Sequence, residues 1–346
     1  MTAEEFAPAK VNLTLHVTGR QSDGYHLLDS LVAFIDAGDR IRATPAPAGE
    51  LSLEVTGPYA DTIPSGDDNL VLRAARMLRD GAAGRGGADH AAKRVDCGAR
   101  LTLEKNLPPS SGIGGGSSDA AAAIRALSRL WDVVLPDTDS LAALGADVPV
   151  CLAARTMRMR GIGQTLSPVP PLPAFHLVMV NPGIAVPTPM VFAALEAAGN
   201  PPMTDRIPSF ASAWDLVAWM HLQRNDLEAP AMRRAPQIRA AVLALSLMPG
   251  CMLSRMSGSG ATCFGMFETA EAATQAQTRL QARHPEWWVR AAQPLSASAP
   301  EIPGVTHKTA DVAQEDVAQE DMAQETEAPM PGGMVESHTA DEPSAP

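Results

Sequence analysis

A glycine-rich segment between residues 107 and 120 constrains the fold of this chain more than any other feature. Four of the five residues from 112 to 116 are glycine, and Ser117 and Ser118 follow them. The segment joins a strand-like run (100–104) to an alanine-rich, helix-like run (120–131). Glycines let a backbone curl around a ligand, serines cap helices, and free N–H groups at a helix start attract anions. The pattern favours a phosphate-binding loop, with a flexible turn as the alternative.

This loop matches neither of two common nucleotide-binding fingerprints. A Walker A loop requires a lysine after its last glycine, and none follows Gly116. A dinucleotide fingerprint requires a third glycine where Ser117 stands. If the loop binds phosphate, its backbone must therefore do so without the usual lysine.

The formal net charge of −12 is concentrated near the C-terminus. Residues 301–346 contain 11 acidic side chains and one basic, whereas the first 300 residues contain 28 acidic and 26 basic ones. Those first 300 residues offer no strongly basic surface, so we expect no nucleic-acid partner. Three near-identical five-residue repeats begin at Asp311, Asp316 and Asp321. We expect residues 296–346 to form a disordered acidic tail, and an unknown partner of that tail is one open explanation of its role.

The cysteines and the apolar runs indicate the compartment. The four cysteines form no C-x-x-C pair, which is typical of reduced thiols in a cytosolic protein rather than of a structural zinc site. The N-terminus has no signal-peptide pattern, and no apolar run reaches the ~18 residues that a membrane span needs. We expect a cytoplasmic protein without a membrane partner.

Strand-like and helix-like segments are interleaved over the first 300 residues. Strands are expected at 11–17, 27–35, 40–43, 51–55, 100–104, 176–180, 252–256, 262–267 and 287–291. Helices are expected at 70–78, 120–131, 141–145, 190–198, 214–223, 238–247 and 270–283, and a loop at 81–94. Prolines between residues 168 and 173 mark the best boundary between two lobes. The order predicts an α/β or α+β architecture.

Three separated segments carry a resemblance when they are considered together. The first contains P-A-K-V-N-L at 8–13 and D-G-Y-H at 23–26, the second is the glycine loop with G-G-G-S-S-D-A-A at 114–121, and the third is S-G-S-G-A-T at 257–262. G-A-D-V-P at 145–149 and P-T-P at 187–189 lie between the second and the third. This ordered set resembles the GHMP kinase superfamily of small-molecule kinases and covers about residues 6–295.

The resemblance implies a two-lobed α+β fold, with an N-terminal lobe like ribosomal protein S5 and a C-terminal ferredoxin-like lobe. The expected limits are 1–167 for the N-terminal domain and 174–295 for the C-terminal domain. The implied activity is ATP-dependent phosphorylation of the 2-hydroxyl of a small substrate that carries a cytidine diphosphate group, on the non-mevalonate route to isopentenyl diphosphate. ATP and Mg²⁺ are the implied cofactors, and the sequence does not identify the Mg²⁺ ligands.

Two charged residues form the implied catalytic pair. Asp147 matches the catalytic aspartate of the family and is expected to act as the base, although its spacing alone also fits a helix-end or turn residue. Lys10 is the implied partner, because an ammonium beside the carboxylate keeps it ionised and lowers the cost of forming an alkoxide. The alternative for Lys10 is an ordinary surface lysine.

The glycine loop is the implied ATP site. The expected ATP-binding residues are Pro108, Pro109, Ser110, Ser111, Gly112, Ile113, Gly114, Gly115, Gly116, Ser117 and Ser118. For Ser117 and Ser118, helix capping is the alternative role. Members of the superfamily often have Gly or Ala where Ser110 and Ser111 stand in this chain.

Recognition of the acceptor is expected to involve three parts of the chain. The implied substrate-binding residues are Asn12, Tyr25, His26, Thr188, Phe192, Ser257, Gly258, Ser259 and Gly260. A cytosine ring stacks on aromatic side chains with about 1–3 kcal/mol per contact, and the chain has only two tyrosines. The alternatives are that Tyr25 and His26 only fill space beside a turn, that Phe192 packs in its helix, and that 257–262 is a tight hairpin.

Two other functions stay open at this point. One is a superfamily kinase acting on homoserine, mevalonate or a sugar, and the turn at 23–26 argues against it because those substrates lack a pyrimidine. The other is a non-catalytic nucleotide-binding or regulatory protein on the same fold, against which the presence of both Lys10 and Asp147 argues.

Overall fold

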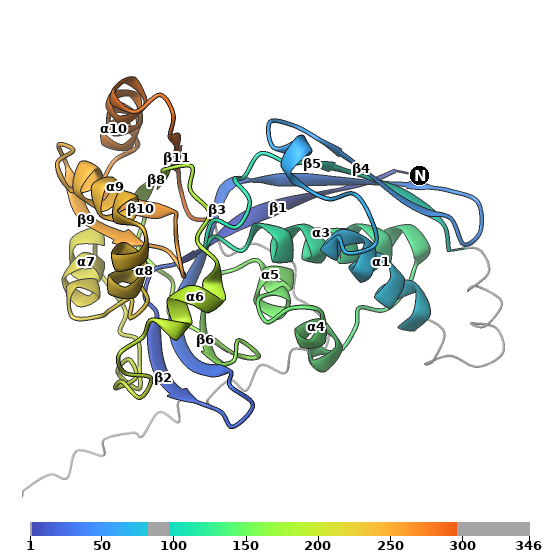
Figure 1. Ribbon diagram of the computed structural model, residues 1–346, viewed down its shortest axis with the longest axis horizontal. Helices are drawn as coiled ribbons and strands as arrows, with labels where there is room; N and C mark the ends of the chain where they lie inside the picture. The colour runs from blue at the N-terminus through green and yellow to red at the C-terminus, as the bar shows by residue number, and fades with distance from the viewer. Residues whose placement is uncertain (1, 82–96, 296–346) are drawn as a thin grey trace, which may run out of the picture. The chain divides into compact units, whose positions relative to one another are not determined.

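A computed structural model describes residues 2–81 and 97–295, which form two β-sheets with helices packed against them (Figure 1). The loop expected at 81–94, except for its first residue, and the expected acidic tail at 296–346 lie outside the described residues. The expected domain limits at 167 and 174 stay predictions.

The larger sheet has seven strands and is organised around one long strand, β3 (His26–Pro45). Because β3 is 20 residues long, four other strands pair with it along its length. The main path is β4-β5-β3-β6-β7, and among the described strands only β4 and β5 pair in parallel. The other members are β1 (Ala3–Asn12), β2 (His16–Arg20), β4 (Leu51–Thr56), β5 (Ala99–Glu104), β6 (Met157–Gly161) and β7 (Thr165–Pro168).

The middle of β3 is buried on both faces. Val32 and Phe34 belong to a cluster of buried side chains with helices on one face of the sheet. Leu31, Ala33 and Ile35 belong to a second cluster that also contains residues of the smaller sheet. Alternate residues of a strand face opposite sides, so the unbroken apolar run 31–35 reflects a strand that is covered on both sides.

The smaller sheet contains β8 (His176–Asn181), β9 (Cys251–Met256), β10 (Cys263–Phe267) and β11 (Trp288–Ala292). Its order is β11-β8-β10-β9, and every pair is antiparallel. With helices between β8 and β9 and between β10 and β11, the chain order is βαββαβ, as in ferredoxin-like folds. The expected ferredoxin-like lobe and the mixed helix-and-sheet class are therefore confirmed.

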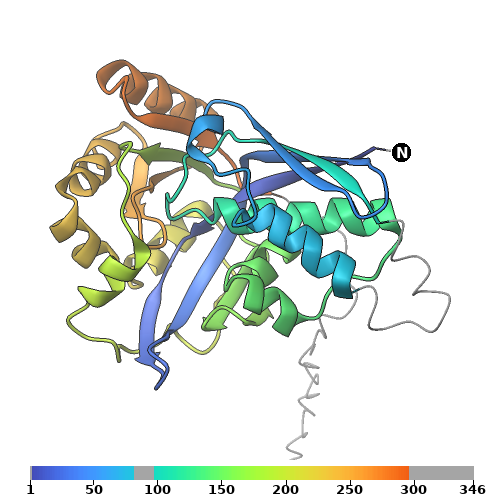
Figure 2. The same cartoon turned by 45° about the vertical axis from the view of Figure 1, so that its right-hand side comes forward.

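Figures 1 and 2 show α1, α3, α4 and α5 gathered along the larger sheet, with α7 to α10 around the smaller one. The helices are α1 (Leu70–Gly81), α3 (Gly115–Trp131), α4 (Thr138–Leu144), α5 (Val148–Ala153), α6 (Thr188–Ala193), α7 (Ala213–His221), α8 (Glu228–Arg234), α9 (Pro236–Ser246) and α10 (Ala270–Arg283). A short 3₁₀ turn, η1 (Ala60–Thr62), precedes α1.

Several expected limits were wrong. The helix expected at 120–131 begins at Gly115, because Gly114 adopts a left-handed conformation that starts the helix without a serine cap. The strand expected at 11–17 is interrupted after Asn12, where Leu15 N donates to Arg224 O in the C-terminal half. The strands expected at 27–35 and 40–43 are one strand, and the helix expected at 190–198 ends at Ala193. The sequence pattern did not predict α5, β6, β7 or α8.

His16 in β2 links the larger sheet to the segment after α7. Its Nε2 accepts the N–H of Arg224 at 3.2 Å, and its Nδ1 lies 3.1 Å from both Pro201 O and Arg224 Nη2. Burial lowers the pKa of His16 below its usual 6.5. The folded protein therefore favours the neutral ring.

The free energy of unfolding should depend on pH through His16. The contribution of the neutral ring is present above pH 6.5 and is lost as the pH falls from there through the lowered pKa of His16. We expect His16→Gln to show a smaller loss of unfolding free energy between about pH 7.5 and about pH 5.5 than the parent chain. Urea denaturation at the two pH values measures it. His221→Gln, at an exposed position, is the matched control, and equal pH dependence in parent and His16→Gln would contradict the prediction.

Candidate active site

A cleft of about 1280 Å³ is lined by residues from distant parts of the chain. They come from β1, the β2–β3 turn, the loop between β5 and α3, the turn before α5, α6 and the turn between β9 and β10. The last of these turns, residues 257–262, is called the second glycine loop below, and residues 108–118 are called the first. Most segments that the sequence motifs predicted to act together thus meet at one cleft.

The first glycine loop ends in the N-terminus of α3. Gly114 is the N-cap, with φ +66°, and no side chain caps this end. The first intrahelical bond runs from Ser118 N to Gly114 O at 2.9 Å, so the N–H groups of residues 115–117 have no acceptor within the helix. These N–H groups and the helix dipole make the cleft wall suited to phosphate.

The second glycine loop supports the first. Ser257 Oγ donates to Gly112 O at 3.1 Å and accepts the N–H of Asn12 at 3.1 Å. A Cβ on Gly112 would lie 2.7 Å from both Ser257 O and Gly260 O. The two backbones therefore pack at a distance that only glycine permits.

A β-bulge lies directly before Lys10 in β1, and the residue lines the cleft. The pairing of β1 with β3 shifts register between Pro8 and Lys10. The N–H of Lys10 donates instead to Ile113 O of the first glycine loop, at 2.9 Å. A bulge re-aims a side chain, and here it fixes the lysine to the loop that is expected to hold phosphate.

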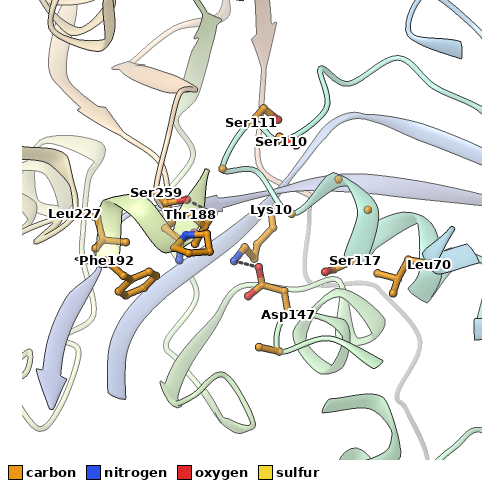
Figure 3. A pocket seen from close by; sticks show the side chains of 18 of the residues that line it. Lys10, Leu70, Ser110, Ser111, Ser117, Asp147, Thr188, Phe192, Leu227 and Ser259 are labelled. Atoms are coloured by element: carbon orange, nitrogen blue, oxygen red, sulfur yellow. Dashed lines mark hydrogen bonds and ion pairs between the residues drawn. The ribbon is translucent and has the colours of Figure 1, made fainter. Parts of the chain in front are cut away.

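Lys10 Nζ and Asp147 Oδ2 are 2.7 Å apart, and the two side chains point toward each other (Figure 3). The lysine side chain is 5% exposed, whereas that of the aspartate is 31% exposed. Asp147 precedes α5 but makes no side-chain cap bond there, which argues against a purely helix-end role. One turn later, burial raises the pKa of Cys151, so this thiol stays protonated and adds no charge beside the pair.

Aromatic groups line the other end of the cleft. The rings of His26 and Phe192 stack with centroids 4.7 Å apart, and Tyr25 beside them is 60% exposed. Burial, and then the nearby Arg20, lower the pKa of His26. A neutral imidazole can donate at one nitrogen and accept at the other.

Thr188 at the start of α6 contacts the second glycine loop. Its Oγ1 lies 2.8 Å from Ser259 Oγ, and both residues line the cleft. Figure 3 shows Ser117 on one side of the Lys10–Asp147 pair, and Thr188 with Phe192 on the other. The cleft therefore has one side formed by the start of α3, which is suited to phosphate, and one aromatic side, with the ion pair between them.

Four residues expected in the site lie outside the cleft lining. Ser118 is buried, and its hydroxyl donates to Pro8 O at 2.7 Å, so it fastens α3 to β1. Ile113 is buried in the core between the sheets, and Ser257 and Gly260 lie behind the first glycine loop. These positions support the loop rather than facing a ligand.

Ser110 and Ser111 shape the start of the first glycine loop. Ser110 has φ +48°, a left-handed conformation that glycine adopts more readily. Ser111 is buried, and its hydroxyl donates to Pro108 O at 2.6 Å. That bond closes a local turn and leaves the later glycines free to face the cleft.

The sequence motifs did not identify several residues on the side of the cleft formed by the start of α3. Lys105, Asp119 and Asn69 all line the cleft, and Asp39 is buried against Lys105. A lysine directly after a strand and an aspartate directly after the two serines were available signals. Nothing in the local sequence marks Asp39.

The described residues hold no cluster of three or more His, Cys, Asp or Glu side chains that could bind a metal by themselves. Mg²⁺, however, is usually held by one or two carboxylates together with substrate phosphates. Asp147 is a partly exposed carboxylate, and Ser117 Oγ is 3.8 Å from where a Cβ of neighbouring Gly145 would lie. This pair of hard oxygen donors fits that mode of binding.

Comparison with known proteins identifies the family. A model of the GHMP kinase N-terminal domain matches residues 69–155, and a model of the C-terminal domain matches residues 212–286. A 4-diphosphocytidyl-2-C-methyl-D-erythritol kinase of Cereibacter sphaeroides is 57% identical over 84% of this chain and 98% of the relative. This chain belongs to the GHMP kinase family. A kinase of the same name from Paracoccus denitrificans is 52% identical over 83% of the chain and 95% of the relative.

Solved structures agree with this GHMP kinase assignment. One of 4-(cytidine 5'-diphospho)-2C-methyl-D-erythritol kinase is 34% identical, with a TM-score of 0.65 over 85% of this chain and 100% of that one. A homoserine kinase from Cytophaga hutchinsonii, 14% identical with a TM-score of 0.58 over 85% of this chain and 94% of that one, shares the fold. As a GHMP kinase, the chain is an ATP-dependent enzyme. In residues 2–81 and 97–295, no helix is long and apolar enough to cross a membrane.

Replacing the carboxylate of Asp147 should separate chemistry from nucleotide binding. We expect Asp147→Asn to lower kcat by about 10²- to 10⁴-fold, because the amide cannot accept the proton of the acceptor hydroxyl. The affinity for ATP measured without Mg²⁺ should stay within about threefold of the parent, since the loop that is expected to hold phosphate is unchanged. Steady-state kinetics and equilibrium dialysis with ATP measure the two effects. Asp139→Asn, at an exposed acid on α4, is the control, and near-normal turnover by Asp147→Asn would refute its role as base.

Proposed function

We propose that this chain transfers the γ-phosphoryl group of ATP to the 2-hydroxyl of 4-diphosphocytidyl-2-C-methyl-D-erythritol, in the non-mevalonate route to isopentenyl diphosphate. The observation that carries the proposal is the Lys10–Asp147 ion pair, which lies between a phosphate-binding helix start and an aromatic wall. The names of the relatives that are 52–57% identical over most of the chain support this acceptor.

The first glycine loop is proposed to hold the triphosphate of ATP. The free N–H groups of residues 115–117 and the α3 dipole stabilise the negative charge that develops during transfer. Ser117 and Asp147 are the proposed ligands of Mg²⁺, which would neutralise phosphate charge when bound. No Walker lysine is needed, because Lys10 supplies a cation from β1.

Asp147 is proposed to take the proton of the acceptor hydroxyl as the oxygen–phosphorus bond forms. Lys10 stabilises the ionised carboxylate beforehand and the negative charge on the attacking oxygen during transfer. Asn12 would orient the acceptor, because its buried Oδ1 has no hydrogen-bond partner among the described residues and the residue lines the cleft. A hydroxyl of the acceptor would satisfy this oxygen.

The cytosine is proposed to stack between Tyr25 and the ring of Phe192, with His26 bonding to its polar edge. Exposure of Tyr25 at the cleft mouth supports this, since the ring is not used in packing the core. Thr188 and Ser259 present hydroxyls at the same wall. Gly258 permits the close approach of this wall to the first glycine loop, because its Cβ would lie 2.6 Å from Gly112 O.

The proposal includes the cellular location and the partners of the chain. A cytoplasmic location fits an enzyme of small-molecule metabolism, and the expectation of no nucleic-acid partner follows from the charge of the first 300 residues. A partner of the acidic tail stays a prediction.

A phosphate-transfer assay with the purified full chain tests the acceptor. We expect ATP-dependent phosphorylation of the cytidylyl substrate and less than about 1% of that kcat/KM with homoserine or mevalonate, because neither fills the aromatic end of the cleft. Coupled ADP release and mass spectrometry of the product measure it. Equal or better turnover of homoserine or mevalonate would overturn the proposed acceptor.

Truncating Tyr25 should weaken acceptor binding selectively. We expect Tyr25→Ala to raise the acceptor KM by about fivefold to 150-fold, as loss of about 1–3 kcal/mol of stacking implies. The KM for ATP should change less, since Tyr25 lies on the aromatic side of the cleft. Trp214→Ala removes an exposed aromatic outside the cleft lining and serves as the control. A larger change in the ATP KM than in the acceptor KM would refute stacking.

A further inference from the structure

Lys105 is a buried lysine that the proposed mechanism does not use. It directly follows β5, and its side chain is 3% exposed. Its Nζ donates to Asp39 Oδ2 at 2.5 Å and to Asp119 Oδ2 at 2.7 Å. Both carboxylates are buried, at 0% and 4% side-chain exposure. An ammonium between two buried carboxylates needs a structural or functional reason, because burying charges is costly.

The three side chains come from the two ends of the first glycine loop and from β3. Asp39 Oδ1 accepts the N–H groups of Asn106 and Leu107 at 2.6 and 2.8 Å, which fixes the chain where it leaves β5. Asp119 lies in the second turn of α3, just after the loop. Lys105 thus connects the chain segment just before the first glycine loop to the helix that follows the loop.

The cluster lies directly beneath the phosphate-binding turn of α3. A Cβ on Gly115 would be 3.1 Å from Lys105 Nζ. A cation at a helix N-terminus is unfavourable by itself, since that end of the dipole is positive. The two carboxylates offset this, and burial raises the pKa of Asp119 above its usual value.

The partners of Asp119 show what Lys105 supplies. Asp119 Oδ1 is buried and has no hydrogen-bond partner among the described residues. The other oxygen, Oδ2, accepts from Lys105 Nζ at 2.7 Å, so the ammonium compensates the buried carboxylate at this oxygen. Without the ammonium, Asp119 would be buried without compensation, and the start of α3 would move to reach water.

We propose that Lys105 is a positioning residue that clamps the two ends of the first glycine loop together. It bonds to Asp39, which accepts the N–H groups just before the loop, and to Asp119, which lies just after the loop. The clamp holds the free N–H groups of residues 115–117 where the triphosphate binds. This proposal rests on the proposed function only in that ATP is taken as the ligand of the first glycine loop.

Binding of MgATP to the full chain, without acceptor, tests the clamp. We expect Lys105→Met to raise the ATP Kd by about tenfold or more, because misplaced donors lose contact with the phosphates. The matched control is Arg125→Met. Arg125 is also on α3, pairs with Glu5 at 2.7 Å, and does not line the cleft. We expect the control to lower the melting temperature and leave the ATP Kd within about twofold of the parent.

Two further comparisons separate positioning from general stability. Asp119→Asn keeps an oxygen for Lys105, so its ATP Kd should rise less than that of Asp119→Leu. If Lys105→Met does not fold, the variant with Lys105→Met, Asp39→Asn and Asp119→Asn removes the uncompensated charges and should fold, with the ATP Kd still raised.

An ATP Kd within twofold of the parent in folded Lys105→Met, or in the triple variant, would overturn the clamp. Equal effects of Asp119→Asn and Asp119→Leu would also contradict it. Failure of the proposed function is distinguishable, because it would appear as ATP binding by the parent chain without phosphorylation of the cytidylyl substrate.

Discussion

The close backbone contact between the two glycine loops organises this enzyme. Gly112 and Gly258 both have positive φ, and each lies within reach of the other loop's carbonyl oxygens. The contact fixes Ile113, whose carbonyl oxygen accepts the N–H of Lys10 and so determines where that lysine lies. One steric constraint thus joins the smaller sheet, the first glycine loop and the cation of the proposed active site.

This constraint explains which parts of the site the sequence could predict. The glycines themselves, the strand before them and the helix after them are local features, and their positions were evident. The start of α3 was placed five residues too late, because serines were expected to cap a helix that Gly114 begins with its own left-handed conformation. That Ser118 and Ser257 face protein rather than ligand depends on contacts with Pro8 and Gly112, which lie more than 100 residues away in the chain.

Charged groups show the same division between local and distant information. The spacing around Asp147 was equally consistent with a helix-end residue, and only the match to a family motif favoured catalysis. The structure adds the partner 137 residues away and shows that no cap bond occupies the carboxylate. Asp39 was missed because it meets Lys105 across 66 residues of sequence through the pairing of β3 with β5, and no periodicity records such a contact.

Lys10 and Lys105 both form buried ion pairs, but the carboxylates that they contact differ in exposure. Both Lys10 and Lys105 are almost fully inaccessible and both contact the first glycine loop or its helix. The carboxylate that faces Lys10 is nearly one-third exposed, so a substrate hydroxyl can reach it. The carboxylates around Lys105 are almost fully buried and are already bonded to its ammonium, so neither is as open to a substrate hydroxyl as Asp147 is. Access to the anion, rather than the identity of the pair, therefore supports the proposed catalytic role of Lys10 and the proposed positioning role of Lys105.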